Sequence, residues 1–187
     1  MGRRSAPEGR RFAPDGLRSS LPMSRFLADH LPSSLVGRLS ADAAFANAQR
    51  AIVLCSVDEH GWPHPAMVSS LELIALDARN IRLALHGASR STRNLRANGR
   101  LTIVLADERG VFYLKGDVLM LAPFMAADQE LATFNMRVDS VLQDDATAYE
   151  GARVTTGIDI ARGAIDEARA RTVLSELAST LSRADRA

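Results

Sequence analysis

Ser89-Arg-Ser-Thr-Arg-Asn-Leu95 is a polar stretch between two strand-like apolar runs, Ile81-Arg-Leu-Ala-Leu-His86 and Leu101-Thr-Ile-Val-Leu105. This order predicts a strand, a helix that begins after a tight turn, and a second strand. Because the first turn of a helix carries unpaired N–H groups and a partial positive charge, the hydroxyl, guanidinium and amide side chains gathered there suit an anion, above all a phosphate. A capped helix with solvated arginines is the alternative that these residues leave open.

The composition is that of one globular domain. The chain has 187 residues, of which 47% are hydrophobic, and this is enough for a sizeable core. A formal net charge of +1 does not indicate a nucleic-acid partner. No apolar run approaches the roughly 20 residues of a membrane span, so we expect no membrane partner either. The single cysteine, Cys55, excludes an internal disulfide and is typical of a reducing compartment, which predicts a cytoplasmic location.

Two segments of different character divide the chain. Residues 1–22 are rich in Arg, Pro, Gly and Ser, and we expect them to form a disordered N-terminal arm. Residues 23–187 are expected to form the domain, including its flanking helices. At its start, Ser24 is suited to cap a short helix over residues 25–30, and Ser40 is suited to cap a second helix that ends near Gln49.

Strand-like patterns follow from Ala51 onward. Apolar runs or period-two alternation, separated by turn residues, predict six strands. Gly116 inside the fifth strand indicates a bulge or a close backbone approach. The predicted strands cover residues 51–57, 62–76, 81–86, 101–106, 111–121 and 154–160.

Two more helices are predicted in the last third of the chain. Asp128 is suited to cap an amphipathic helix to about Gln143, because Leu131, Phe134, Val138 and Leu142 recur at helical spacing. A final helix is expected over residues 165–181. Tight turns between most strands imply antiparallel pairing, and closure removes the exposed edges of such a sheet. The fold predicted is therefore mainly β with peripheral α-helices: a six-stranded antiparallel Greek-key split β-barrel, with the helix over 128–143 crossing between strands five and six.

No metal site and no catalytic group is indicated. The chain has four histidines and no cysteine pair, and His60 and His64 lie around a turn rather than on one helical face. A Gly-x-Ser-x-Gly elbow, a Walker loop and a dinucleotide fingerprint are all lacking. Cys55 lies in an apolar run, where an inert buried thiol is expected rather than a nucleophile.

Four segments, in this order and spacing, carry a family resemblance. Together they resemble the pyridoxamine 5′-phosphate oxidase-like family of FMN-binding split barrels, over about residues 40–180. The segments are Gly61-Trp-Pro-His-Pro-Ala-Met-Val-Ser-Ser70, Ser91-Thr-Arg-Asn-Leu95, Tyr113-Leu-Lys-Gly116 and Val154-Thr-Thr-Gly-Ile158.

The resemblance implies flavin mononucleotide (FMN) bound at a homodimer interface. The second-strand segment would lie along the isoalloxazine ring, which implicates Met67, Val68 and Ser69. The strand-to-helix turn would hold the phosphate, which implicates Arg90, Ser91, Thr92 and Asn94. Lys115 would lie near the ring or its phosphate. For three of these residues another role stays open: Ser69 on a solvated strand face, Asn94 as a helix cap and Lys115 as a surface lysine.

Three departures from the family pattern narrow the function. Many relatives carry a lysine or arginine where Ser91 stands, and a haem-handling relative would place a histidine there. The chain after Tyr149 contains no histidine and no tryptophan, so pyridoxamine 5′-phosphate is not the expected substrate. The resemblance implies a flavin-dependent oxidoreductase that acts on a small molecule, with NADH or NADPH as the electron donor. A flavin- or haem-binding protein without turnover and a deazaflavin-dependent reductase are the alternatives.

A homodimer is also expected from the fifth strand. Both of its faces are largely apolar, whereas a closed barrel buries only one, and an exposed apolar face marks an interface. One face carries Phe112, Leu114, Val118 and Met120, and the other carries Val111, Tyr113, Asp117 and Leu119.

Overall fold

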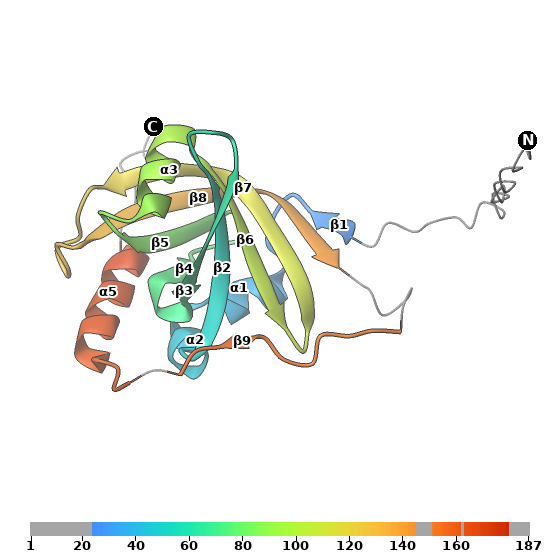
Figure 1. Cartoon of the computed structure of the whole chain (residues 1–187). Helices are drawn as coiled ribbons and strands as arrows, with labels where there is room; N and C mark the ends of the chain where they lie inside the picture. Colours follow the sequence, from blue (N-terminus) through green and yellow to red (C-terminus); the bar gives the residue numbers. More distant parts are fainter. Residues whose placement is uncertain (1–23, 145–150, 162, 180–187) are drawn as a thin grey trace, which may run out of the picture.

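A computed structural model describes residues 24–144, 151–161 and 163–179. It contains one strongly curled antiparallel sheet with a few helices around it, as the sequence predicted (Figure 1). The predicted arm, residues 1–22, lies outside the described residues. The strands are β1 (Ser24–Ala28), β2 (Arg50–Val57), β3 (Pro63–Ser69), β4 (Leu73–Ala75), β5 (Asn80–His86), β6 (Arg100–Asp107), β7 (Gly110–Ala122), β8 (Leu131–Asp144) and β9 (Ile158–Asp159).

The strand order confirms the split barrel, but the sheet of the described residues has nine strands where six were predicted. Hydrogen-bonded neighbours follow the order β3-β2-β6-β7-β8-β5-β4, while β1 pairs with β8 and β9 pairs with β2. All of these pairs are antiparallel. The strands β7 and β8 are the longest, and they cross the whole molecule (Figure 1). Because strands that are distant in sequence are neighbours in this order, their residues lie side by side on the outer surface of the sheet.

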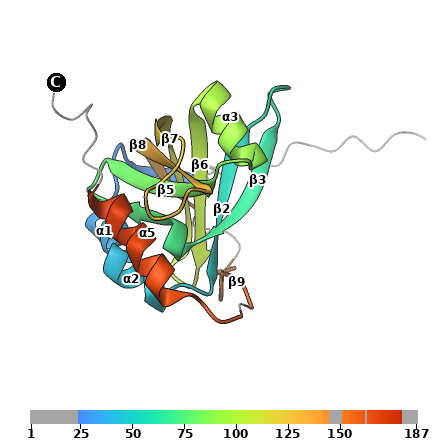
Figure 2. The same ribbon diagram turned by 90° about the vertical axis from the view of Figure 1, so that its left-hand side faces the viewer.

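Helices cover the two ends of the curled sheet. Helices α1 (Ser33–Arg38), α2 (Ala41–Ala46) and α5 (Glu167–Ser179) gather on one side, and α3 (Arg90–Asn98) lies apart from them (Figure 2). The predicted helices after Ser40 and near the C-terminal end are confirmed as α2 and α5. Ser40 caps α2 by accepting a hydrogen bond from the Ala43 N–H at 3.2 Å. Gly99 ends α3 with φ of 61°, a left-handed conformation that glycine adopts without steric cost.

The core has two parts. The larger fills the inside of the curled sheet, and its centre is formed by residues that are fully buried, such as Leu83, Ile103, Leu114 and Phe134. The smaller lies between α2, α5 and the short strand β4, and includes Met125 and Leu177. Alternate residues of β6 point into the larger core, as the period-two pattern predicts.

One predicted strand, over residues 62–76, is broken in the structure. A 3-10 turn, η1 (Ser70–Glu72), separates β3 from β4. Its cause is a capping box: Glu72 Oε2 accepts a hydrogen bond from the Ser69 N–H at 2.7 Å, while the Ser69 hydroxyl oxygen accepts one from the Leu71 N–H at 3.3 Å. This Ser-x-x-Glu spacing is visible in the sequence, yet the prediction missed it.

The predicted helix over 128–143 is wrong, because Leu131–Asp144 form the long strand β8. Ala132, Phe134, Met136 and Val138 are all buried, which is a period of two. After Val138 the phase changes, because β8 pairs Ser140 with Lys115 but Val138 with Gly116. A bulge of this kind breaks the alternation, and the remaining apolar residues then imitate helical spacing. The crossing helix between strands five and six is therefore absent at this place.

Two further predictions near the chain ends are corrected. The short helix over 25–30 is wrong, since Ser24–Ala28 form β1 and pair with the last residues of β8. The sixth strand over 154–160 is reduced to the two residues of β9, which pair with Arg50 and Ala51 of β2. In both cases an available sheet edge, rather than local propensity, decides the conformation.

Gly116 confirms the predicted close approach. A Cβ atom at this position would lie 1.9 Å from the Arg137 carbonyl oxygen, so only glycine fits without a backbone shift. The register shift between Lys115 and Gly116 lies at the same place. None of the helices in the described part of the chain is long and apolar enough to cross a membrane.

Candidate functional site

The N-terminal turn of α3 is held by two residues of the opening stretch, together with the last residue of β5. Ser89 is the N-cap, and its hydroxyl oxygen accepts a hydrogen bond from the Thr92 N–H at 3.1 Å. The Thr92 hydroxyl donates to the His86 carbonyl at 2.9 Å, and Thr92 is only 1% exposed. The turn is therefore held in shape by its own hydroxyls, and the predicted helix cap is present.

Two kinds of donor remain available at this turn. The N–H groups of Arg90 and Ser91 precede the first helical hydrogen bonds and donate to no described residue. The side chains of Arg90 and Arg93 are exposed, and no carboxylate among the described residues forms an ion pair with either of them. The first turn of α3 contains no acidic residue. Positive charge and free N–H groups thus coincide, which is the requirement for binding an anion.

Asn94 links α3 to the sheet instead of capping the helix. Its side-chain amide donates to the Ser56 hydroxyl on β2 at 3.0 Å, and both residues are buried. The Ser56 hydroxyl in turn lies 3.4 Å from the His64 carbonyl of β3. These contacts fix the helix against the β2–β3 hairpin. The sequence offered little sign of Ser56, since it occupies one inward position of an apolar run.

Strand pairing places an apolar row on the outer surface of the sheet. Its residues lie directly opposite one another on six neighbouring strands, so their side chains point to the same side. The two outermost, Phe26 and Met67, are each 63% exposed. We call this the outer row; in strand order it consists of Phe26, Leu142, Tyr113, Val104, Val53 and Met67.

The other predicted site residues fall on different sides of the sheet. Lys115 is exposed and lies two residues from Tyr113, so it borders the outer row. Val68 points into the core and is 7% exposed. Ser69 is 1% exposed, and its hydroxyl is engaged, since it donates to Glu72 Oε2 at 3.0 Å. A contact of Val68 or Ser69 with a ring would therefore use the backbone, as the resemblance implied for this segment.

Two groups on this surface, Cys55 and Tyr113, have raised pKa values. Burial raises the pKa of the Cys55 thiol, so it stays protonated at neutral pH. Burial and the nearby Asp144 carboxylate, whose Oδ2 lies 3.2 Å from the Tyr113 hydroxyl, raise the pKa of Tyr113. Neither group is suited to act as a base at neutral pH. Among the described residues, no cluster of three or more His, Cys, Asp or Glu side chains is arranged to hold a metal ion.

Comparison with known proteins confirms the resemblance. A sequence profile of the pyridoxamine 5′-phosphate oxidase family matches residues 40–155. The uncharacterised protein YclD of Bacillus subtilis (strain 168) is 34% identical over 110 residues, which cover 59% of this chain and 70% of YclD.

Two solved structures resemble the chain more distantly. A pyridoxamine 5′-phosphate oxidase-like protein of Lactobacillus delbrueckii has a TM-score of 0.49 and 14% identity, covering 61% of this chain and 94% of that protein. HupZ of Group A Streptococcus has a TM-score of 0.48 and 11% identity, covering 68% of this chain and all of that protein, 100%. Likenesses at this level do not indicate a ligand. The profile match spans more than half of the sequence, and the chain therefore belongs to the pyridoxamine 5′-phosphate oxidase family.

Proposed function

We propose that this protein binds FMN and acts as a flavin-dependent oxidoreductase on a small molecule. The observation that carries the proposal is the N-terminal turn of α3, where the guanidinium groups of Arg90 and Arg93 stand unpaired among the described residues beside free N–H groups. Guanidinium groups form charge-assisted, bidentate hydrogen bonds with phosphate oxygens, so this donor set fits the phosphate of FMN.

The residues near this turn would have two different roles, binding the phosphate and stabilising the turn. Arg90, Arg93 and the first N–H groups of α3 would hold the phosphate. Thr92 and Asn94 have their polar groups engaged with His86 and Ser56, so their part is to keep the turn in shape. Ser91 is 7% exposed and lies between these two sets. A direct contact of Ser91, Thr92 or Asn94 with the phosphate stays a prediction.

Strand β3 supports a ring-binding role for Met67 to Ser69. It ends the hydrogen-bonded order of the sheet, so one side of its backbone has no strand partner in the described part of the chain. Free backbone N–H and C=O groups on an edge strand match the polar edge of an isoalloxazine ring. The exposed Met67 side chain and the neighbouring outer row would supply an apolar surface for the ring face.

The outer row supports a dimer in which the two outer rows meet. Lys115 borders this row, so a second copy would enclose it together with any ring placed along β3. When bound, FMN supplies hydride or single-electron transfer at its ring, and the protein supplies binding, orientation and exclusion of water. NADH or NADPH in the cytoplasm is the proposed electron donor, and no protein side chain is assigned as acid or base.

The visible spectrum of the purified protein tests the proposal. We expect the absorbance of oxidised flavin, and we expect it to bleach after NADH or NADPH is added without oxygen. Flavin absorbance that persists with both donors would contradict the oxidoreductase and leave flavin binding. A Soret band, or failure to bind added FMN, would contradict the proposal as a whole.

A further inference from the structure

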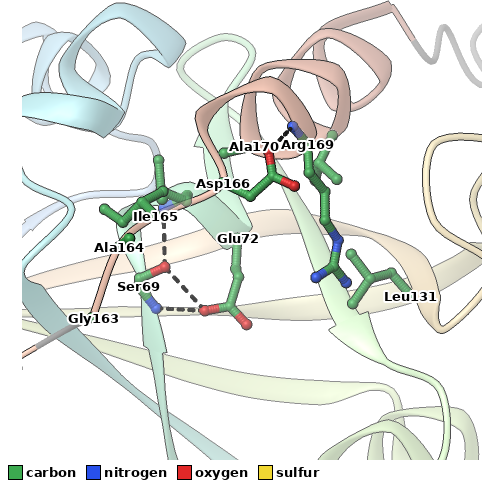
Figure 3. A pocket seen from close by; sticks show the side chains of 11 residues that line it. Ser69, Glu72, Leu131, Gly163, Ala164, Ile165, Asp166, Arg169 and Ala170 are labelled. Atoms are coloured by element: carbon green, nitrogen blue, oxygen red, sulfur yellow. Dashed lines mark hydrogen bonds between the residues drawn. The ribbon is translucent and has the colours of Figure 1, made fainter.

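A second site lies between α5 and the end of β3. It is a pocket of about 460 Å³, within the range of small-molecule sites (Figure 3). Its floor is formed by the Ser69–Glu72 turn, and its roof by residues 163–166 and the first turns of α5. Neither α3 nor the arginines of the proposed phosphate site line it.

The walls of this pocket are mainly apolar. Leu71 in the floor and Val173 in the roof are buried, while Leu131 and Ile165 are partly exposed. Aliphatic side chains on several sides favour a ligand with a flat apolar body over a sugar or a free ion. The burial of apolar surface is the main favourable contribution to the free energy of binding in such a pocket.

Two carboxylates add negative charge to the pocket. Glu72 uses Oε2 for the Ser69 N–H and hydroxyl, and its Oε1 accepts no hydrogen bond from a described residue. Asp166 uses Oδ1 for the Arg169 N–H at 3.0 Å, and its Oδ2 likewise has no donor among the described residues. Figure 3 shows both side chains gathered below α5, where they line the same pocket. Each carboxylate is oriented by its own contacts and keeps one oxygen for a ligand.

The arginine of the pocket gives its side-chain hydrogen bonds to a carboxylate outside the lining, although its charge also attracts Asp166. Arg169 donates from Nε at 2.7 Å and from Nη2 to Asp128 Oδ2, a residue outside the pocket lining. The hydrogen bond from Arg169 lowers the pKa of Asp128, so this pair stays ionised and neutral as a unit. The pocket therefore keeps the net negative charge of Glu72 and Asp166, which attracts a cation and repels a phosphate ester or a carboxylate.

We propose that this pocket binds a small molecule in which a flat apolar body carries a protonated amine. The amine would donate to Glu72 Oε1 and Asp166 Oδ2, while the body packs against Leu131 and Ile165. Ser69 belongs both to the pocket and to the segment proposed along the flavin ring. That the amine is the substrate rests on the proposed flavin function; the binding of amines does not.

Three probes of one shape test this binding: benzylamine, benzyl alcohol and benzoate. They are titrated by calorimetry at neutral pH into full-length protein without added flavin. We expect benzylamine to bind about tenfold more tightly than benzyl alcohol, and benzoate to bind most weakly. Glu72→Gln keeps an oxygen for the Ser69 N–H, and Asp166→Asn keeps a helix cap, so both should fold. Each variant should lose most of the preference for the amine and leave the affinity for benzyl alcohol unchanged.

Glu59→Gln is the matched control, because its side chain is 85% exposed on the β2–β3 turn. It should keep the full preference. Equal affinities for benzylamine and benzyl alcohol in the wild type would overturn the proposal, and so would a preference that survives both Glu72→Gln and Asp166→Asn. FMN titration of the same samples separates the two hypotheses: amine binding without FMN binding refutes only the flavin function, and the reverse result refutes only this site.

Discussion

At the scale of single residues, the Ser89–Leu95 stretch has a structural role and a proposed binding role, and its sequence does not show which residue has which role. Ser89, Thr92 and Asn94 point inward or along the chain and hold the turn, while Arg90 and Arg93 point into solvent. This division follows from the helix period: residues three and four apart share a face, so buried and exposed positions alternate within a single turn.

Arg90→Ala tests the phosphate assignment. Charge-assisted hydrogen bonds contribute roughly 1.5–3 kcal/mol, and solvent exposure reduces this, so we expect FMN to bind about tenfold more weakly. Riboflavin, which lacks the phosphate, should bind almost as well as to the wild type. Fluorescence quenching with both flavins measures the ratio.

The control is Arg96→Ala, the same truncation on the exposed side of α3 but in its last turn. It should leave both affinities unchanged. Equal loss of FMN and riboflavin in Arg90→Ala would refute the phosphate assignment. Ser91→Ala together with Thr92→Ala is a less selective test, since Thr92 also stabilises the turn and its loss should lower the melting temperature.

At the scale of elements, Gly116 is required because β7 and β8 approach each other closely at this position. Gly116→Ala would place a methyl group 1.9 Å from the Arg137 carbonyl oxygen, so β7 or β8 must shift. We expect a loss of about 1–3 kcal/mol in the free energy of unfolding, measured by urea denaturation.

Gly37→Ala is the matched control for this substitution. Gly37 lies within α1, and a Cβ there would meet nothing within 4 Å. The change should be neutral or stabilise the protein by about 0.5–1 kcal/mol, because alanine favours the helix. Similar effects of the two substitutions would contradict the close approach at the bulge.

The Asp29 carboxylate, directly after β1, forms hydrogen bonds that depend on its ionisation and therefore on pH. Hydrogen bonds with His30, at 2.7 Å, and with Arg79, at 2.8 Å, lower the pKa of Asp29 from 3.8 to about 2. Because the folded state has the lower pKa, the stabilisation is complete above pH 3.8 and is lost as the pH falls through about 2. Asp29→Asn should therefore lower stability at neutral pH, and the difference from the wild type should shrink in acid.

A carboxyl titration followed by NMR measures this pKa directly. We expect a midpoint near 2 for Asp29 in the wild type. Arg79→Gln removes the charged donor on the β4–β5 turn and should move the midpoint upward. A midpoint near 3.8 in the wild type would show that neither contact persists in solution.

At the scale of the whole molecule, the outer row predicts a homodimer. Six apolar side chains in one row across six strands form a surface that a single copy leaves partly exposed. We expect a dimer mass by light scattering at low micromolar concentration. Val104→Glu places a charge in the middle of the row and should give a monomer.

Phe124→Glu is the control for this charge insertion. Phe124 is 56% exposed and lies outside the row, so its substitution should leave the dimer intact. A monomer mass for the wild type, in the presence of saturating FMN, would contradict the proposed interface.

The predicted N-terminal arm gives the last test at this scale. Residues 1–22 contain too little apolar surface to offset the conformational entropy that ordering would cost. Deleting them should leave the melting temperature within a few degrees and FMN affinity unchanged. A large drop in either quantity would show that the arm packs against the domain.

The sequence by itself determined that the protein is an antiparallel barrel. Apolar runs or period-two alternation predict strands directly, and they occur at residues 51–57, 81–86, 101–106 and 111–121. It also determined the capped, arginine-rich start of α3 and the close approach at Gly116. The tertiary structure alone decided β1 and β8. In β8 a bulge hides the alternation, and in β1 the partner strand supplies the hydrogen bonds that local propensity does not predict. It alone decided the outer row and the pocket as well, because both depend on which strands and helices become neighbours, and that pairing is set by contacts between residues distant in sequence.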